Sequence, residues 1–209
     1  MVLGNRIERS YDGIDWIGNS FSTLQNIGAR NHATSERAKR DFYATEPKAV
    51  RLLLEKVQFE GEIWECACGN GDLSKEMERL GYDVYSSDII IRDYDCVEYD
   101  FLSMENIHTD KNIITNPPYK LANQFIRKAL EITEIGKKIA FLLPIRYITG
   151  KERKGIFNEN PPLYFLVSSG SLKCALNGDF AKKIGNALEF AWFVWEKGYK
   201  GETILRWFN

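Results

Sequence analysis

The tetrapeptide Asn116-Pro117-Pro118-Tyr119 places an amide, two prolines and an aromatic ring directly after the apolar run at 112–115. Proline has no backbone N–H for a β-ladder, so a buried strand that contains this run must end here. The amide oxygen and the proline carbonyls are hydrogen-bond acceptors, and the diproline offers no competing N–H donor. The tyrosine ring adds a face on which a planar ligand can stack. A rigid turn that only ends the strand is the alternative.

A second chemical signal is the segment ECACGNGDL at 65–73, where an expected strand runs into Gly69, Gly71 and the start of a helix. Glycines in such a turn let the backbone approach a ligand closely. The third glycine of the dinucleotide fingerprint is missing, and Glu65 would not favour a pyrophosphate. A cationic or amino-bearing ligand would suit this acid, although a plain tight turn gives the same pattern.

Two further acids follow at expected strand ends. Asp88 lies seventeen residues after Gly71, where a carboxylate can accept hydrogen bonds from two ribose hydroxyls. Asp100 could accept the exocyclic amine of an adenine beside Phe101 or Leu102. Each acid could equally cap a helix or form a turn. Taken together they describe a site for an adenosine with a charged tail and no phosphates, which S-adenosyl-L-methionine fits.

Alternating strands and helices must position these residues. The sequence predicts helices at 45–57, 72–81 and 121–132, and strands at 62–67, 83–88, 97–102, 112–116, 138–144, 163–167, 188–195 and 203–208. Thr45 is the expected cap of the first helix. We expect an α/β fold with a mostly parallel sheet of about seven strands and an antiparallel C-terminal hairpin, formed by the last two strands. Ligands of such sheets bind beyond the carboxyl ends of the strands.

Composition and charge set limits on partners. The chain has 209 residues, 28 basic and 29 acidic. Residues 60–110 contain 14 acidic and 3 basic residues, whereas 120–154 contain 9 basic and 3 acidic ones. An acidic first half and a basic second half suggest two ligands, the second polyanionic, although two solvated faces would look the same. Residues 1–40 read as an irregular arm, and 41–209 as one domain.

Metal and membrane functions have little support. The four cysteines lack the paired spacing of zinc sites, and only two histidines could assist them. No early apolar run has the length of a signal peptide or a membrane span. We therefore expect a cytoplasmic, reduced protein without a metal, and the sequence indicates no particular protein partner.

The segments DFYATEP, ECACGNGDL, SSDI, YDFL and NPPY occur in this order, and the chain resembles the class I S-adenosylmethionine-dependent methyltransferases. The resemblance is closest to the small phage-type DNA N6-adenine methyltransferases. It covers residues 26–209, since NIGARNHATSER and AWFVWEKGYKGE also look like that group. It implies a Rossmann-like fold and S-adenosyl-L-homocysteine as the product.

The resemblance also implies residue roles. Phe42, Tyr43 and Thr45 would flank the methionine end of the cofactor, and Glu65 would lie near its ammonium. The turn of Ala67, Cys68, Gly69, Asn70 and Gly71 would pass under it. Asp88 would hold the ribose, Ile89 would also contact the cofactor, and Asp100 with Phe101 would hold the adenine.

Chemistry explains why such an enzyme needs the tetrapeptide. The lone pair of an adenine amine is delocalised into the ring, so the nitrogen is a poor nucleophile. Asn116 and a proline carbonyl can each accept one amine N–H, which directs the lone pair at the methyl group. These acceptors also stabilise the positive charge that develops on nitrogen. Tyr119 would stack the base, which must leave a duplex first.

The sequence leaves three hypotheses about function open. The first is double-stranded DNA, and the second is an RNA base or a protein glutamine methylated through the same geometry. The third is a cofactor-binding subunit without activity, against which the complete tetrapeptide argues. For DNA, target contacts are expected within 145–187, and the candidate basic residues are Lys120, Arg146, Lys151, Arg153 and Lys154. The arm is the alternative location.

Overall fold

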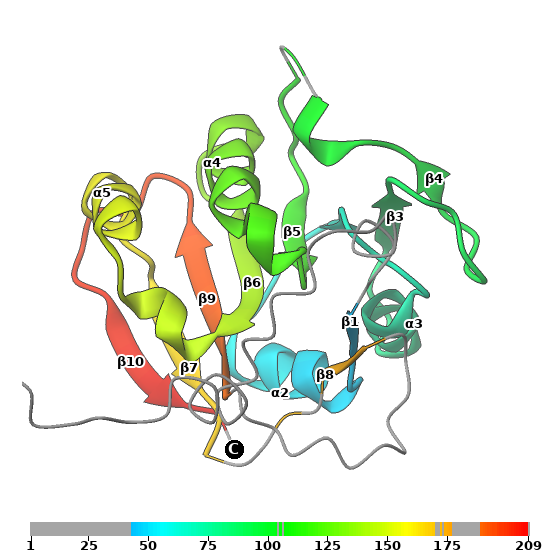
Figure 1. The fold of residues 1–209 in the computed structure, drawn as a ribbon, viewed down its shortest axis with the longest axis horizontal. Coiled ribbons are helices and arrows are strands. Elements are labelled where there is room, and N and C mark those ends of the chain that lie inside the picture. Colours follow the sequence, from blue (N-terminus) through cyan, green and yellow to red (C-terminus); the bar gives the residue numbers. More distant parts are fainter. Residues whose placement is uncertain are drawn as a thin grey trace, which may run out of the picture.

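An eight-stranded sheet has the order β10-β7-β9-β6-β5-β2-β3-β4 (Figure 1). The computed structural model describes residues 43–103, 105, 107–169, 172, 174–176 and 189–208. The strands are β2 Ile63–Glu65, β3 Val84–Asp88, β4 Val97–Glu98, β5 Asn112–Thr115, β6 Lys138–Pro144, β7 Tyr164–Val167, β9 Phe190–Glu196 and β10 Ile204–Trp207. A separate antiparallel pair consists of β1 Tyr43–Thr45 and β8 Cys174–Leu176. The expected arm, residues 1–40, lies outside the described residues.

Strand directions confirm the expected α/β fold. Strands β4, β3, β2, β5 and β6 run parallel to one another, and β7 runs parallel to β10. Strand β9 runs antiparallel to both β6 and β7. The sheet is therefore mostly parallel with an antiparallel C-terminal portion.

The last two strands differ from the expected hairpin in one respect. Strand β7 lies between β9 and β10, so the two strands do not bond to each other. The residues of β9 from Phe190 to Trp195 are buried, whereas all four residues of β10 are exposed. The backbone N–H and C=O groups of a strand buried on both faces need hydrogen-bonding partners along both edges, and β6 and β7 supply them for β9.

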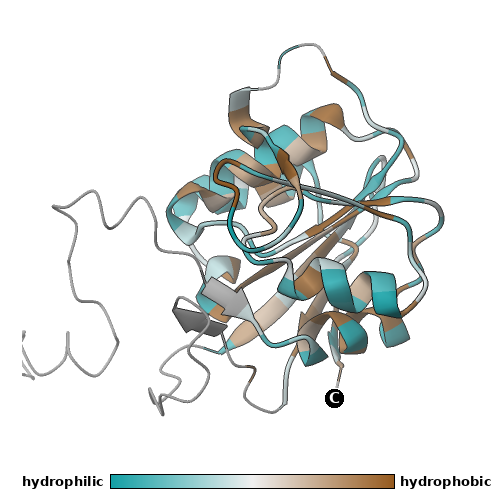
Figure 2. Cartoon of the chain, turned by 90° about the vertical axis from the view of Figure 1, so that its right-hand side faces the viewer, coloured by the Kyte–Doolittle hydropathy of each residue, from teal (hydrophilic) through white to brown (hydrophobic). Residues whose placement is uncertain are grey.

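Helices cover both faces of the sheet. They are α2 Lys48–Lys56, α3 Asp72–Arg79, α4 Ala122–Ile132 and α5 Lys151–Glu159, with short 3-10 turns η2 Phe101–Ser103, η3 Tyr119–Leu121 and η4 Ile145–Ile148. Each carries hydrophobic and hydrophilic residues (Figure 2). Helices α4 and α5 contribute buried side chains to one core cluster, and α2 and α3 to the other. None of the helices in the described part is long and apolar enough to cross a membrane.

Strand β9 shows how the two core clusters form. Phe193 and Trp195 lie in the cluster under α4 and α5, whereas Trp192 and Val194 lie in the cluster under α2 and α3. This alternation is the two-residue period of a strand that is buried on both faces. Burial of each large apolar side chain stabilises the fold by about 1.5–3 kcal/mol.

The start of α2 departs from the expected helix. Pro47 occupies the N-cap position of α2, and no side chain caps this end. Thr45 instead ends strand β1. Proline suits the first turn of a helix, because the N–H that it lacks would have no partner there. The hydroxyl of Thr45 is thus available for another contact.

A buried acid joins the two helices that precede and follow β2. Glu76 of α3 accepts hydrogen bonds from Arg79 Nε at 2.8 Å and from Arg51 Nε of α2 at 2.9 Å. The two guanidinium groups lower the pKa of Glu76 from 4.5 to about 2. Because the folded pKa is lowered, this contact stabilises the fold above about pH 4.5, and the stabilisation is lost as pH falls toward 2.

Glu76→Gln should lower the free energy of unfolding at pH 7 by about 1–2 kcal/mol. The expected loss is modest because both arginine side chains are exposed, so that water screens their attraction to Glu76. Urea titrations from pH 7 to pH 3 should show the gap to the native chain narrowing below pH 4.5. Glu55→Gln, at an exposed position of α2, is the matched control and should change little. Equal stability of Glu76→Gln and the native chain at pH 7 would contradict this role.

Candidate functional site

Three polar residues meet at one edge of the sheet. Glu65 ends β2, Asp88 ends β3 and Asn116 follows β5. These strands are parallel, and β2 lies between β3 and β5, so their carboxyl ends share this edge (Figure 1). The described structure therefore brings together residues that are up to 51 positions apart in the sequence.

The turn after β2 needs its glycines. Gly69 and Gly71 have φ angles of +56° and +74°, in the left-handed region that residues with a Cβ rarely adopt. A Cβ at Gly71 would also lie 2.4 Å from the ring of Tyr94. Gly71 is the N-cap of α3, and its carbonyl accepts the N–H of Lys75 at 2.9 Å. The glycines thus turn the chain sharply from β2 into the helix.

Asp88 holds this turn against the next strand. Its Oδ2 accepts the Gly69 N–H at 2.9 Å, and its Oδ1 accepts the Ile90 N–H at 2.9 Å. Arg92 Nη1 also donates to Oδ1 at 3.0 Å, a partner that the sequence pattern did not indicate. Ile89 beside it is 60% exposed. Asp88 therefore shapes the loop itself, and Ile89 presents an open apolar surface next to it.

Glu65 is a buried acid in a chain of hydroxyl groups. Its side chain accepts a hydrogen bond from Ser74 Oγ, which lies 2.7 Å from Ser86 Oγ. Burial raises the pKa of Glu65 well above its usual range, and the charges of Asp72 and Asp88 raise it further. A cation placed beside Glu65 would lower this pKa again. The group is thus suited to compensate a positively charged ligand.

The hydroxyl chain extends away from the site. Tyr94 Oη lies 3.3 Å from Ser86 Oγ and donates to Glu78 at 2.8 Å. The three residues Ser74, Ser86 and Tyr94 were not expected to belong to the site, since lone serines and tyrosines carry no spacing signal. Ser74 and Ser86 position the Glu65 carboxyl, and the Tyr94 ring lies against the glycine turn at Gly71.

The segment after β4 separates two residues that were predicted to act together. Asp100 is exposed, and its Oδ1 accepts the Leu102 N–H at 2.9 Å. Phe101 is only 1% exposed, with its ring 5.3 Å from that of Trp64 and 5.1 Å from that of Phe125. The ring of Phe101 belongs to the core, so only its backbone could meet a ligand.

The remaining residues predicted to contact a cofactor fall in three groups. Ala67, Cys68 and Asn70 form the turn between β2 and α3, as expected. Phe42 lies outside the described residues, and of Tyr43 the structure describes the backbone in β1.

Among the described residues, no cluster of three His, Cys, Asp or Glu side chains could hold a metal.

The Asn116 amide is held from the side by Thr45. Asn116 Nδ2 donates to Thr45 Oγ1 at 2.8 Å, and Thr45 is only 3% exposed. An amide carries its oxygen and nitrogen on opposite sides of one carbon, so this contact turns Oδ1 away from Thr45. Pro117 is buried and Pro118 is exposed. The tetrapeptide thus has a fixed amide at the edge of the sheet.

Tyr119 is supported by a second tyrosine. Its ring centroid lies 5.9 Å from that of Phe190, and its carbonyl accepts a hydrogen bond from Tyr147 Oη. Burial raises the pKa of the Tyr147 hydroxyl, which keeps it protonated as a donor. Tyr147 belongs to η4, directly after β6, and the sequence pattern gave no signal for it.

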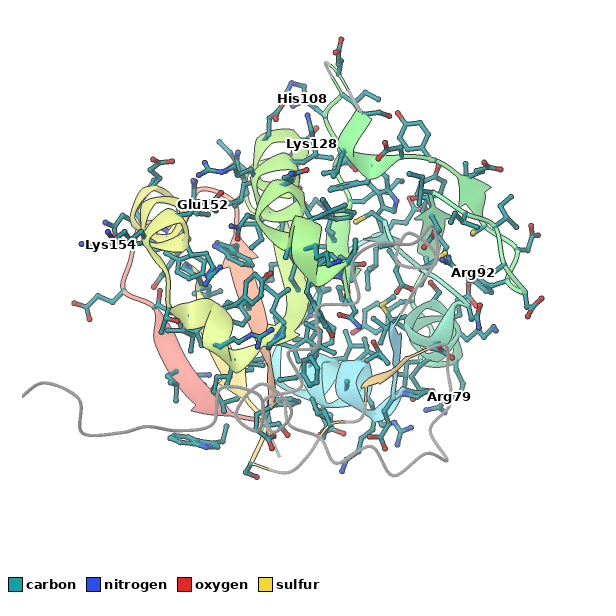
Figure 3. The ribbon with its side chains drawn as sticks, in the orientation of Figure 1. Arg79, Arg92, His108, Lys128, Glu152 and Lys154 are labelled. Carbon is teal, nitrogen blue, oxygen red and sulfur yellow. The ribbon has the colours of Figure 1, made fainter. Side chains whose placement is uncertain are left out.

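The predicted basic residues follow β5 and β6 along the chain but differ in their surroundings. Lys120, Arg146, Lys151 and Lys154 are exposed. Arg153 instead lies over the Tyr147 ring at 4.6 Å, and its Nε donates to the Thr149 carbonyl at 2.5 Å. In Figure 3, Lys154 on α5 and Arg92 lie on opposite sides of the molecule. Lys154 thus lies on the other side of the molecule from Arg92, the partner of Asp88.

Comparisons with known proteins bear on the fold. Neither protein-family profiles nor curated protein sequences match the chain. A candidate class I S-adenosylmethionine-dependent methyltransferase from Listeria monocytogenes is similar with a TM-score of 0.54 and 15% identity, covering 89% of this chain and 71% of that one.

Two further solved structures are similar. The predicted O-methyltransferase Atu636 from Agrobacterium tumefaciens has a TM-score of 0.52 and 14% identity, over 75% of this chain and 83% of that one. The type IIG restriction endonuclease BpuSI has a TM-score of 0.50 and 12% identity, over 88% of this chain and 29% of that one. The chain therefore has the Rossmann-like fold of the class I S-adenosylmethionine-dependent methyltransferases.

Proposed function

We propose that the chain transfers the methyl group of S-adenosyl-L-methionine to the exocyclic N6 amine of adenine in DNA. The observation that carries the proposal is the Asn116 amide, held by Thr45 at the strand edge that also bears Glu65 and Asp88. A fixed amide oxygen beside a proline carbonyl is an acceptor pair for an amine. The acidic groups beside it suit a ligand with a positive charge and a ribose.

The residues of the glycine turn fit the cofactor. The buried carboxyl of Glu65 would become ionised beside the ammonium of the methionine end, because the cation offsets the cost of burying its charge. Asp88 has lone pairs beyond those that Gly69, Ile90 and Arg92 use, and these can accept ribose hydroxyls. Exposed Ile89 offers an apolar surface to the adenine ring.

In the reaction, the chain acts on the acceptor amine. When bound, S-adenosylmethionine supplies an electrophilic methyl group and leaves as S-adenosylhomocysteine. Asn116 Oδ1 and a proline carbonyl would accept the two amine hydrogens, so the nitrogen lone pair points at the methyl carbon. The amine nitrogen would bond to the methyl carbon, the carbon–sulfur electron pair would leave with the sulfur, and the nitrogen would then release a proton to water. The two acceptors stabilise the positive charge that nitrogen carries in between.

Two features favour a base in DNA as the acceptor. Tyr119 is half-buried beside Asn116 and supported by Tyr147, as a stacking ring for a flipped base requires. The exposed cation Lys120 lies in η3 and Arg146 in η4, so both follow carboxyl ends of strands at this edge, and exposed Lys151 and Lys154 follow in α5. Such a basic edge would contact phosphates on either side of the flipped base.

Asn116→Ala should lower kcat for methyl transfer by at least 100-fold, because a preorganised acceptor of developing charge is removed. Labelled S-adenosylmethionine is incubated with duplex DNA, RNA or cell protein, and incorporation is counted for each. Cofactor affinity should stay within a few-fold. Asn158→Ala, at an exposed position of α5, is the matched control. Normal turnover by Asn116→Ala would contradict the catalytic role, and labelling of RNA or protein alone would contradict the DNA assignment.

Asp88→Asn should weaken binding of S-adenosylmethionine by about tenfold or more, since charge-assisted hydrogen bonds contribute about 1.5–3 kcal/mol each. Titration calorimetry measures the Kd. Because Asp88 also holds the loop through Arg92, the variant Arg92→Gln serves as the control and should change the Kd by only a few-fold. An unchanged Kd in folded Asp88→Asn would remove this residue from the cofactor site.

Lys151→Gln combined with Lys154→Gln should weaken DNA binding and make its logarithmic salt dependence shallower by up to about two units. Arg153 is left in place because it supports Tyr147. The control pair is Lys56→Gln with Lys137→Gln. Lys56 is exposed in the last turn of α2, and Lys137 is half-buried directly before β6, so both lie before the amino ends of parallel strands. Binding is measured by fluorescence anisotropy at several salt concentrations. Identical slopes for both pairs would place the nucleic acid elsewhere.

A further inference from the structure

We propose that Thr45 is a positioning residue for the transfer reaction, whose hydroxyl holds the Asn116 amide with its oxygen turned toward the acceptor amine. This deepens the proposed function and rests on it. The role differs from the expected place of Thr45 beside the methionine end of the cofactor. It also differs from the helix cap that the sequence pattern favoured.

The contact joins two distant segments. Thr45 Oγ1 accepts the Asn116 Nδ2 hydrogen at 2.8 Å across 71 residues of sequence. The amide nitrogen and oxygen have nearly the same size but opposite hydrogen-bonding character. If the amide were turned over, its N–H groups would face the N–H groups of the substrate amine, and one acceptor would be lost. A hydrogen-bonding partner of Nδ2 therefore decides whether Asn116 Oδ1 can accept a hydrogen bond from the substrate amine.

The surroundings of Thr45 keep its hydroxyl in place. Strand β1 pairs with β8, and Thr45 lies opposite Cys174 in the register. Four residues later, the Ala49 carbonyl at the start of α2 accepts the Nε1–H of buried Trp192 at 2.9 Å. The start of α2, which directly follows the Thr45 segment, is thus fixed to strand β9. A hydroxyl on such a frame can orient a side chain that follows β5.

Other uses of this hydroxyl fit the structure less well. No side chain caps α2, so Thr45 has no role there. With 3% exposure, Thr45 offers little surface to a ligand as large as the cofactor. A cofactor contact and the amide contact predict different kinetics. Loss of a cofactor contact raises the Kd for the cofactor, whereas loss of the amide contact lowers kcat at saturating cofactor.

Thr45→Val keeps the shape of the side chain but removes the hydroxyl, and Thr45→Ser keeps the hydroxyl. For Thr45→Val we expect kcat to fall by about 10- to 100-fold, with the Kd for S-adenosylmethionine within a few-fold. Thr45→Ser should retain kcat within a few-fold of the native chain. Thermal unfolding checks that each variant is folded, and Thr45→Ala replaces the valine variant if valine does not fold.

A second readout does not require activity. In ¹⁵N-labelled protein, the side-chain amide signals of Asn116 are assigned by their loss in Asn116→Ala. Thr45→Val should shift one of these signals and speed its exchange with water, whereas Thr45→Ser should not. If the native chain transferred no methyl group but Thr45→Val still shifted the Asn116 signal, only the proposed function would be contradicted. Native kcat in Thr45→Val, a tenfold higher cofactor Kd with kcat unchanged, or an unshifted amide would each overturn the positioning role.

Discussion

The parallel alignment of β2, β3, β5 and β6 is the constraint on which the whole site depends. Parallel strands end at one edge, so groups that follow different strands become neighbours without any long-range sequence signal. The alignment requires strands that are buried on both faces, and the two core clusters under the helices provide this. The same packing that stabilises the fold therefore places the acids Glu65 and Asp88 at the same edge as the Asn116 amide.

Two short side chains and one backbone N–H from neighbouring segments then fix the functional groups. Ser74 holds Glu65, the Gly69 N–H holds Asp88, and Thr45 holds the Asn116 amide. Each partner restricts rotation of a group whose direction decides its chemistry. The buried acid and the amide serve different ligands in the proposed reaction, the first a cation and the second an amine that becomes cationic. Both are acceptors in a partly desolvated setting, where such contacts are strong.

Much of this arrangement was predictable from the sequence, because strand periodicity and turn residues are local signals. Strand β6 has the expected bounds, and the glycine turn, Asp88 and the tetrapeptide all lie at strand ends. Tertiary packing decides the rest. It places β7, and not β10, beside apolar β9, and it buries the ring of Phe101, which no local pattern indicated. The partners Thr45, Ser74 and Tyr147 act through single hydroxyl groups, which leave no spacing pattern in a sequence.

The identity of the methylated product tests the central claim most directly. Duplex DNA that lacks modified bases is incubated with the native chain and S-adenosylmethionine, digested to nucleosides and analysed by mass spectrometry with authentic standards. Transfer directed by the Asn116 amide predicts N6-methyldeoxyadenosine as the modified nucleoside. Methylation of a ring carbon, of another base, or of no nucleoside at saturating cofactor would contradict the account.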